Sequence, residues 1–369
     1  MNKIHGGNIY EIARQYGKKP DKLIDFSASI NPLGLSKRAE KKIKANLSSI
    51  VHYPDDEGFL VKKVLAEYHG LPEENFLIGA GSTEFIYAFP QVLKIRRALI
   101  VTPTFSEYEN ALESFGGERI EMHYFETTEE DGFEINVGSL ISALLLGYDA
   151  LYICNPNNPT GVLTEREDLL NILKITEREK IWFILDEAFI DFVEKESLKK
   201  EAASSWRLII MRSLTKFFAL PGLRIGYLIS HPQIIAEFKR KREPWRVNAL
   251  AQIAAVESLQ DKNYIQKTKE LIAQEKERLI QGLRAIPGFI PYPGKANFLL
   301  VQIHPHLYLT AAELKEMLIT EGILIRDCRS FHHLGPFFFR LAIRSPRENN
   351  RLLKALQKIQ KKIILKENL

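Results

Sequence analysis

The sequence predicts an α/β protein in which a three-layer, mixed and mostly parallel sheet is followed by a smaller α+β domain. From about residue 75 onward, short apolar segments alternate with segments of helical periodicity. This alternation is typical of strands that are connected by helices in a sheet covered on both faces. Beyond about residue 245 the pattern changes to long helices and then returns to short apolar segments, which indicates the second domain.

The strands of the large domain are predicted at apolar segments that read NFLIGAG, RALIVTP, DALYICNP, KIWFILDEA, RLIIMRSL and GYLIS. Helical patterns between them include STEFIYAFPQVLK and EREDLLNILKITERE. In the second domain, ANFLLVQI, GILIRDC and FFFRLAIR are predicted to be strands. The amphipathic segment NYIQKTKELIAQEKERLIQGLRAI is predicted to be the long helix that joins the two domains.

The composition is that of an ordinary globular protein and argues against several functional classes. The 369 residues are 45% hydrophobic and 26% charged, with a formal net charge of +5. This modest basic excess suits a small anionic substrate better than a nucleic acid. Cys154 and Cys328 have no metal-binding spacing, and no apolar stretch reaches the roughly 18 residues of a membrane-spanning helix. We therefore expect a soluble cytoplasmic protein that binds no metal, membrane or nucleic acid.

Residues whose side chains can bind ligands or take part in reactions follow directly after several predicted strands. In open α/β sheets, ligands bind beyond the carboxyl ends of the strands, so these residues are expected to meet at one edge. In LIGAGST, Gly81, Ser82 and Thr83 lie between a strand and a helix, where free N–H groups and the helix dipole can bind an anion. Ser and Thr are also ordinary N-caps, so this motif alone leaves both interpretations open.

Two further strand endings carry a hydrogen-bonding amide and a carboxylate. In CNPNNPTG, the proline-rich turn holds Asn158 in place as a hydrogen-bond donor, although plain loops have the same composition. In WFILDEAF, Asp186 follows a strongly apolar segment, so its carboxylate needs a cationic partner. A protonated pyridine nitrogen would be such a partner. A core salt bridge or a helix N-cap would also explain this aspartate.

The segment SLTKFFALPGLRIGY places a single amine in apolar surroundings. Burial makes a lysine amine less basic and more nucleophilic, so Lys216 is a candidate to carry an aldehyde as an imine; the alternative is a surface lysine with apolar neighbours. Ser213 and Arg224 flank this lysine and could both hold a phosphate. A phosphate, a pyridine nitrogen and an aldehyde on one molecule describe pyridoxal phosphate.

Together these motifs resemble those of fold-type I pyridoxal-phosphate enzymes of the aspartate-aminotransferase superfamily, over nearly the whole chain. Asn-Pro-Thr-Gly and Ser-x-x-Lys, with an arginine eight residues after the lysine, are its most specific features. HGGNIYEIARQYG, LIDFSASINPLG, PWRVNALAQ and ILIRDC are similar to segments of the branch that holds histidinol-phosphate aminotransferase and threonine-phosphate decarboxylase. The resemblance implies that residues 46–245 form an aspartate-aminotransferase-like large domain. Residues 246–369 then form the linking helix and small domain, on which residues 1–45 pack.

The resemblance implies a role for each cofactor-binding residue. Lys216 anchors the cofactor and later transfers protons, Asp186 pairs with the pyridinium nitrogen, and Asn158 bonds the phenolic oxygen of the ring. Tyr108 stacks on the face of the ring. The residues that hold the cofactor's phosphate are Ser82, Thr83, Ser213 and Arg224.

The resemblance also implies a substrate site that two subunits of a homodimer build together. Tyr53 reaches the phosphate of the neighbouring subunit. Arg340 receives the α-carboxylate of a small phosphorylated amino acid, a task for which a planar guanidinium is suited, and Asn158 contacts the same substrate. Candidates for the substrate's own phosphate are Arg326, then His5 with the backbone of Gly6 and Gly7, and, as looser options, Arg329 and Arg344.

The implied reaction is the decarboxylation of L-threonine O-3-phosphate to (R)-1-aminopropan-2-yl phosphate in cobalamin biosynthesis. Many aminotransferases have a tyrosine three residues after the aspartate, whereas this chain has Phe189, which favours the decarboxylase. The same residues can serve transamination, so histidinol-phosphate aminotransferase and serine-phosphate decarboxylase are alternatives. A third hypothesis, a non-catalytic binding protein that uses the same cleft, is disfavoured because Lys216, Asp186, Asn158 and Arg224 are all present.

Overall fold

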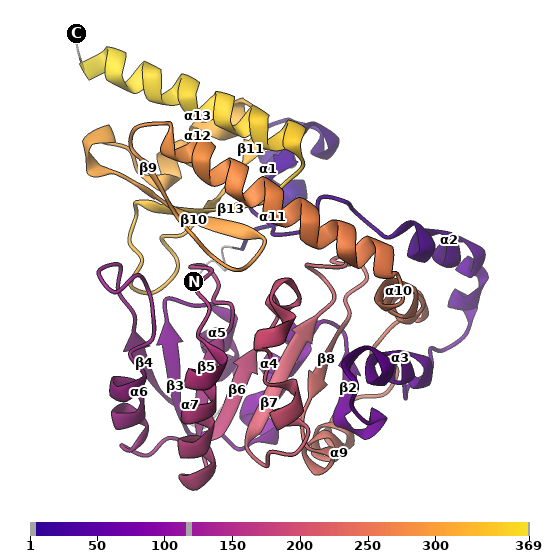
Figure 1. Ribbon diagram of the computed structural model, residues 1–369. Coiled ribbons are helices and arrows are strands. Elements are labelled where there is room, and N and C mark those ends of the chain that lie inside the picture. The colour runs from indigo at the N-terminus through magenta and orange to yellow at the C-terminus, as the bar shows by residue number, and fades with distance from the viewer. Residues whose placement is uncertain (1–4, 116–119, 368–369) are drawn as a thin grey trace.

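Two domains, one above the other in Figure 1, make up the chain. The computed structural model describes residues 5–115 and 120–367. The large domain contains a seven-stranded sheet between two layers of helices, and the small domain contains a four-stranded antiparallel sheet with helices packed on it. The predicted fold class, a mixed and mostly parallel sheet followed by a smaller α+β domain, is confirmed.

The strands of the large sheet follow the order β2-β8-β7-β6-β5-β3-β4. They are β2 (Phe76–Gly79), β3 (Arg97–Thr102), β4 (Glu121–Glu126), β5 (Ala150–Cys154), β6 (Trp182–Asp186), β7 (Leu208–Ser213) and β8 (Gly226–Ile229). Strands β3 to β7 are parallel to one another, and β8 is antiparallel to both of its neighbours. Each predicted strand is present. Strand β4 is not indicated by the sequence, because this edge strand is exposed or half-buried and has no continuous apolar segment.

Alternate side chains of the central strands face opposite sides of the sheet, as the geometry of a strand requires. In β7, Leu208 and Ile210 pack in one helix layer, whereas Ile209 and Met211 pack in the other. By the same alternation, Ser213 at the end of β7 faces the side of Met211, and Arg212 faces the opposite side. This alternation decides which residues reach the functional site described below.

Helices cover both faces of the large sheet (Figure 1). One layer contains α3 (Phe59–His69), α6 (Val137–Leu144), α7 (Arg166–Arg178), α8 (Lys199–Ala202) and α10 (Ala249–Leu259). The other layer contains α4 (Ser82–Val92), α5 (Glu107–Ser114) and α9 (Pro232–Lys241). α2 (Lys37–Ala45) lies beside α10, where Arg38 forms an ion pair with Glu257. The short 3-10 helices are η1 (Pro20–Lys22), η2 (Leu47–Val51), η3 (Glu73–Asn75), η4 (Ile190–Phe192), η5 (Glu194–Glu196) and η6 (Pro305–Leu307).

The small domain is connected to the large domain through α11 (Lys262–Arg284), the predicted long helix. Tyr264, near its start, packs in the core of the large domain, whereas Ile272 and Leu279 pack in the core of the small domain. The antiparallel sheet has the order β12 (Arg326–Asp327), β13 (Phe338–Ala342), β10 (Phe298–Ile303) and β9 (Phe289–Tyr292). The other helices of this domain are α12 (Ala311–Thr320) and α13 (Pro346–Glu367).

The N-terminal part of the chain packs on the small domain. Ile12 of α1 (Ile9–Gln15) lies in an apolar cluster with Ile319, and β1 (Ile24–Asp25) pairs in parallel with β11 (Ile323–Leu324). Phe26 follows directly and is completely buried in the small-domain core. These contacts bring Ser27 and the residues after it to the boundary between the domains. The domain limits at residues 45 and 245 stay a prediction.

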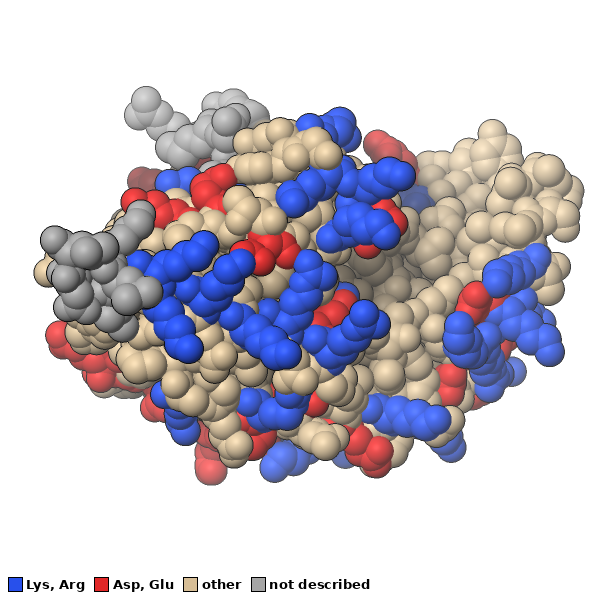
Figure 2. All heavy atoms as spheres, turned by 90° about the horizontal axis from the view of Figure 1, so that it is seen from above, with Lys and Arg blue, Asp and Glu red and all other residues tan. Residues whose placement is uncertain are grey.

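Figure 2 shows the molecule from above, with the small domain toward the viewer. Many lysines and arginines lie on this face among acidic and uncharged residues. Helix α13 exposes Arg347, Arg351, Lys354 and Lys358. Lys358 pairs with Glu321 across a distance of 2.6 Å. Within residues 5–115 and 120–367, no helix combines the length and the apolar character that spanning a membrane would require.

Candidate active site

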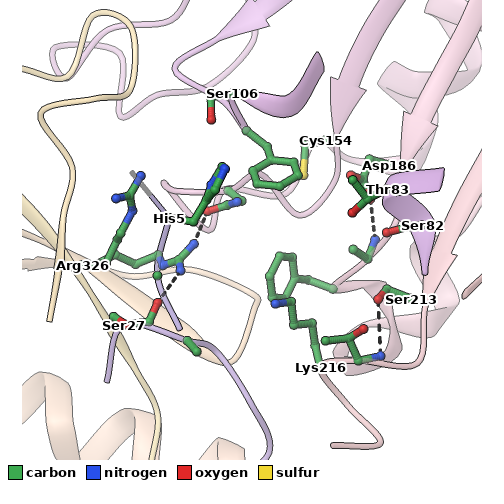
Figure 3. A pocket seen from close by; sticks show the side chains of 18 of the residues that line it. His5, Ser27, Ser82, Thr83, Ser106, Cys154, Asp186, Ser213, Lys216 and Arg326 are labelled. Carbon is green, nitrogen blue, oxygen red and sulfur yellow. Dashed lines mark hydrogen bonds between the residues drawn. The ribbon is translucent and has the colours of Figure 1, made fainter. Parts of the chain in front are cut away.

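A cavity lies at the carboxyl edge of the large sheet, where the small domain and the N-terminal segment face it (Figure 3). Figure 3 shows Ser82, Thr83, Asp186, Ser213 and Lys216 on one side and His5, Ser27 and Arg326 on the other. Most of the predicted site residues line this cavity, namely His5, Gly6, Ser82, Thr83, Asn158, Asp186, Ser213, Lys216, Arg224, Arg326 and Arg340, whereas Gly7, Tyr53, Tyr108, Arg329 and Arg344 do not.

Lys216 lines the cavity from the segment that follows β7. Burial, reinforced by the positive charges of Arg340 and Arg224, lowers the pKa of its amine from 10.5 to about 8. Its backbone carbonyl accepts a hydrogen bond of 3.0 Å from the N–H of Asn31, which fixes the chain at this point. A lysine with this pKa is partly neutral near pH 7, so its amine can act as a nucleophile.

Asp186 lies at the end of β6 and is 4% exposed. Its carboxylate accepts hydrogen bonds from the Tyr108 hydroxyl (2.6 Å) and the Ala188 N–H (2.9 Å). Burial raises the pKa of the carboxyl, although these hydrogen bonds and the charge of Lys216 oppose the shift. In the described part of the chain no cation forms an ion pair with Asp186, so the cavity offers this carboxylate to a cationic group of a ligand.

Tyr108 does not line the cavity, so the structure corrects the prediction that this residue stacks on a bound ring. Its side chain lies in the layer beneath, 1% exposed, and its ring stacks on Tyr152 with 5.5 Å between centroids. The reason is that Tyr108 lies inside α5, on the face that packs against the sheet. Tyr108 therefore orients Asp186, and the aromatic ring that lines the cavity near it is that of Phe105.

The start of α4 forms an anion site together with a guanidinium group. Gly81 precedes this helix with φ +83°, and a Cβ atom there would lie only 2.5 Å from Nη2 of Arg224. A Cβ atom at Gly226 would likewise lie 2.7 Å from the N atom of Ser82. Both glycines therefore let the arginine, the strand and the free N–H groups of the helix approach closely. The polar residues of this anion site are Ser82, Thr83, Ser213 and Arg224.

Arg340 and Asn158 face each other across the domain boundary. Arg340 extends from β13, is 7% exposed, and donates a hydrogen bond from Nη1 to Oδ1 of Asn158. Its Nη2 donates to the carbonyl of Ser27 at 2.9 Å, and Nε has no partner among the described residues. Burial lowers the pKa of Arg340 to about 10. A buried arginine with unused donors is suited to receive a carboxylate.

Arg326 lies next to Arg340, because the two residues are paired across β12 and β13. It is 5% exposed, donates a hydrogen bond of 2.9 Å to Oγ of Ser330, and lies 5.1 Å from the ring centroid of Phe331. Burial lowers the pKa of its guanidinium. The small domain thus presents two neighbouring cations to the same cavity, enough for a substrate with two anionic groups.

His5 completes the rim of the cavity on the same side as Arg326 (Figure 3). The chain after it turns closely over Ser27, since a Cβ atom at Gly6 would lie 2.2 Å from the Ser27 carbonyl oxygen. The two looser options for substrate phosphate do not line the cavity. Arg329 pairs with Asp327 at 2.9 Å, and Arg344 pairs with Glu348 at 2.7 Å.

Tyr53 lies outside the cavity of its own chain. Its side chain is 78% exposed, and its ring stacks on Trp245 with 4.4 Å between centroids. A role of Tyr53 in the site of a neighbouring subunit stays a prediction.

Several lining residues were not predicted from the sequence. They are Ser27, Ala28, Phe105, Ser106, Cys154, Ala188, Thr215 and Phe331. Phe105 and Ser106 follow β3 in the segment TPTFS, so their position after a strand is a signal that could have identified them. Phe331 belongs to a loop of the small domain and has no such signal.

On the opposite face of the sheet, a buried ionic network lies behind the site. Arg212 pairs with Glu187 and with Glu194, at 2.8 Å in each case, and donates a hydrogen bond to Ser197. Arg212 and Glu187 are the immediate neighbours of Ser213 and Asp186, and both side chains are almost completely buried. The network therefore joins the ends of β6 and β7.

Residues 21–356 match the model of a protein family that is described as aminotransferase class I and II. The chain belongs to this family. The match covers both domains and includes every cavity-lining residue named above except those in the first 20 residues.

Relatives of this aminotransferase family member include enzymes of two kinds. It is 41% identical to the threonine-phosphate decarboxylase of Salmonella typhimurium over 97% of each chain. The L-threonine-O-3-phosphate decarboxylase of Porphyromonas gingivalis is similar in structure, with a TM-score of 0.79, 27% identity and coverage of 91% of this chain and 99% of that one. The histidinol-phosphate aminotransferase of Clostridium acetobutylicum is similar as well, with a TM-score of 0.85, 32% identity and coverage of 92% and 100%.

We expect the substitution Lys216→Met to stabilise the protein in the absence of any cofactor. Because the pKa of Lys216 falls from 10.5 to about 8 on folding, the folded state binds fewer protons between these pH values. Below pH 8 the cost of burying the charge is fully present, and it disappears as the pH rises to 10.5. Urea unfolding should therefore show the variant up to about 3 kcal/mol more stable at pH 7 and nearly equal to the wild type above pH 10.5. An equal difference at both pH values would contradict this account.

Proposed function

We propose that this protein is a pyridoxal-phosphate-dependent lyase that decarboxylates L-threonine O-3-phosphate to (R)-1-aminopropan-2-yl phosphate, in cobalamin biosynthesis. The observation that carries the proposal is the pair of buried arginines, Arg340 and Arg326, which face one cavity with Lys216. The substrate has two anionic groups, a carboxylate and a phosphate, and the pair offers one guanidinium to each. The 41% identity to the Salmonella decarboxylase supports the same assignment.

The residues of the large domain fit the chemical groups of pyridoxal phosphate. Its aldehyde would be held by Lys216, its ring nitrogen by the uncompensated carboxylate of Asp186, and its phenolic oxygen by Asn158. Phe105 is one of the aromatic residues that line the cavity, together with Phe189 and Phe331. The phosphate of the cofactor would be held at the start of α4 by Ser82, Thr83, Ser213 and Arg224.

The residues of the small domain would orient the substrate. Arg340 would bind the α-carboxylate through Nη1 and Nη2, the groups that donate to Asn158 and Ser27 in this structure. Arg326, with His5 and Gly6 at the rim, would bind the substrate phosphate. Because Arg326 and Arg340 are adjacent on paired strands, they fix the direction of the substrate between its two anionic ends.

Pyridoxal phosphate, when bound, supplies an electron-withdrawing ring that takes up the electron pair of the bond broken at the α-carbon. The direction in which Arg340 holds the carboxylate decides whether this group or the hydrogen is lost. Loss of the carboxylate as carbon dioxide leaves an α-carbon that needs a proton. Lys216, whose pKa of about 8 allows both protonation states near neutrality, is the group in the cavity that can provide it.

A second candidate function, histidinol-phosphate aminotransferase, is favoured by the TM-score of 0.85 to the Clostridium acetobutylicum enzyme. The residue at position 189 argues for the decarboxylase. Phe189 lines the cavity and packs edge-on against Phe298, with 5.0 Å between centroids, so no hydroxyl is offered at that position. Serine phosphate is a further candidate substrate because it carries the same two anionic groups.

We expect the purified protein, supplied with pyridoxal phosphate, to release carbon dioxide from threonine phosphate without forming glutamate. The assay would compare threonine phosphate, serine phosphate and, with 2-oxoglutarate, histidinol phosphate, and would follow carbon dioxide and glutamate together. The matched control is Lys216→Ala, which should abolish turnover and the visible absorption of the bound cofactor. Glutamate formed from histidinol phosphate without carbon dioxide would favour the aminotransferase instead.

The variant Arg326→Ala tests the assignment of the substrate phosphate. Loss of a buried, charge-assisted contact should raise the KM for threonine phosphate by about 30-fold or more, whereas weak binding of unphosphorylated threonine should change little. Arg329→Ala is the matched control, because this arginine follows three residues later, just after β12, and lies outside the cavity. Equal weakening of both ligands by Arg326→Ala would place the phosphate elsewhere.

We also propose that the protein is a homodimer in which Tyr53 of the partner subunit completes the phosphate site. The support is a set of exposed apolar side chains in η2 and the start of α3, near Tyr53 in the sequence. They are Leu47, Ile50, Val51, Phe59 and Leu60.

Analytical ultracentrifugation should then give about twice the chain mass of 42.4 kDa. Val51→Glu, which places a charge on the 77% exposed Val51, should shift the protein toward the monomer and lower its activity. A wild-type monomer with full activity would overturn the dimer proposal.

A further inference from the structure

The carboxylate of Glu107 lies next to the cavity and has no role in the site as described so far. Glu107 is in the first turn of α5, directly after the lining residues Phe105 and Ser106, and 9% of its side chain is exposed. It accepts hydrogen bonds from the Tyr87 hydroxyl (2.7 Å, at Oε2) and from Nδ2 of Asn110 (2.6 Å, at Oε1). Both donors are neutral, so they fix the direction of the carboxylate without balancing its charge.

The third partner of Glu107 is His5. Nε2 of His5 lies 3.0 Å from Oε1 of Glu107, and in the described part of the chain no other cation forms an ion pair with this carboxylate. A carboxylate oxygen accepts hydrogen bonds, so Nε2 of His5 is the donor in this contact. Nδ1, at the other edge of the ring, is then available for a hydrogen bond with a second group.

The position of His5 is fixed from a second direction as well. The N–H of Gly7 donates a hydrogen bond of 2.8 Å to Oγ of Ser27, and Gly6 lies against the Ser27 carbonyl, which also accepts from Arg340. The short segment from His5 to Gly7 is therefore held between α5 of the large domain and Ser27 at the domain boundary. His5 lines the cavity between these two attachments.

We infer that Glu107 is a positioning residue that fixes the ring of His5 through Nε2 and leaves Nδ1 to bond the phosphate of the substrate. This inference rests on the proposed function, since it takes a phosphorylated amino acid as the ligand of the cavity. In this arrangement Arg326 binds the phosphate from the small domain, while the Glu107–His5 pair binds it from the large-domain side. The phosphate of the substrate thereby contacts residues on both sides of the cavity. A substrate that has no phosphate makes neither of these contacts.

The test is the variant Glu107→Gln, measured with threonine phosphate and with unphosphorylated threonine. The amide keeps a hydrogen-bond acceptor for His5 and removes the negative charge. We expect the KM for threonine phosphate to rise about tenfold while kcat changes less than twofold, and we expect the binding of threonine to stay unchanged. The double variant with His5→Asn should be no weaker than His5→Asn alone, because Glu107 acts through His5.

Glu109→Gln is the matched control. Glu109 lies on the same helix two residues later and also pairs with a histidine, His332, at 2.8 Å, but neither residue lines the cavity. This variant should keep the wild-type KM. A second variant, Asn110→Ala, removes one donor from Oε1 of Glu107 without changing its charge, and it should raise the same KM about twofold to threefold.

The inference is overturned if Glu107→Gln lowers kcat at unchanged KM, if it weakens both ligands equally, or if its effect persists in the His5→Asn background. Unchanged kinetics in both Glu107→Gln and Asn110→Ala would overturn it as well. The proposed function fails by a different result, the absence of carbon dioxide release by the wild type. In that case the dissociation constant of threonine phosphate is measured for the wild type and for each variant from the absorption change of the bound cofactor. These dissociation constants are then compared in place of the KM values.

Discussion

The buried ion pair between Arg212 and Glu187 is the interaction on which the geometry of the site depends. Arg212 precedes Ser213, and Glu187 follows Asp186, so the pair joins the ends of β6 and β7 on the face opposite the cavity. Side chains alternate along a strand, and fixing Arg212 and Glu187 on one face therefore directs Ser213 and Asp186 to the other. Removing Arg212 would leave the buried carboxylate of Glu187 without a cation, which is strongly destabilising. The orientation of Ser213 and Asp186 in the cavity thus depends on an ion pair between their sequence neighbours.

The cavity itself has an excess of positive charge. Lys216, Arg224, Arg326 and Arg340 line it, whereas Asp186 is the lining carboxylate. These cations act on one another: the charges of Arg340 and Arg224 help to lower the pKa of Lys216, and that of Arg326 helps to lower the pKa of Arg340. Such mutual repulsion opposes folding of the empty protein, and it is relieved when anions bind. The excess charge that adds to burial in lowering the pKa of Lys216 therefore also provides the attraction for phosphate and carboxylate groups.

The large domain could be predicted from the sequence because its strands are continuous apolar segments with polar residues at their ends. Asp186, Asn158, Lys216 and Ser213 were found in this way, and all of them line one cavity. Edge strand β4 was missed, since its side chains are partly exposed and lack an apolar run. Tyr108 was predicted to stack on the cofactor ring but packs beneath Asp186, because a single aromatic residue near the start of a helix does not show which face packs inward. Glu107 could not be found from the sequence at all, as its partner His5 lies about 100 residues away.

The contact between Arg340 and Ser27 has a consequence for how the protein is made. The two residues are separated by 313 positions, and β1 likewise pairs with β11 near the other end of the chain. A ribosome delivers the N-terminal residues first, so Ser27 and Phe26 must wait for nearly the whole chain before their partners exist. The sheet of the large domain uses residues between Phe76 and Ile229 and can form earlier during synthesis. A chain that has been made as far as Ile229 already contains the polar residues of the anion site at α4, whereas both arginines of the small domain are still to be added.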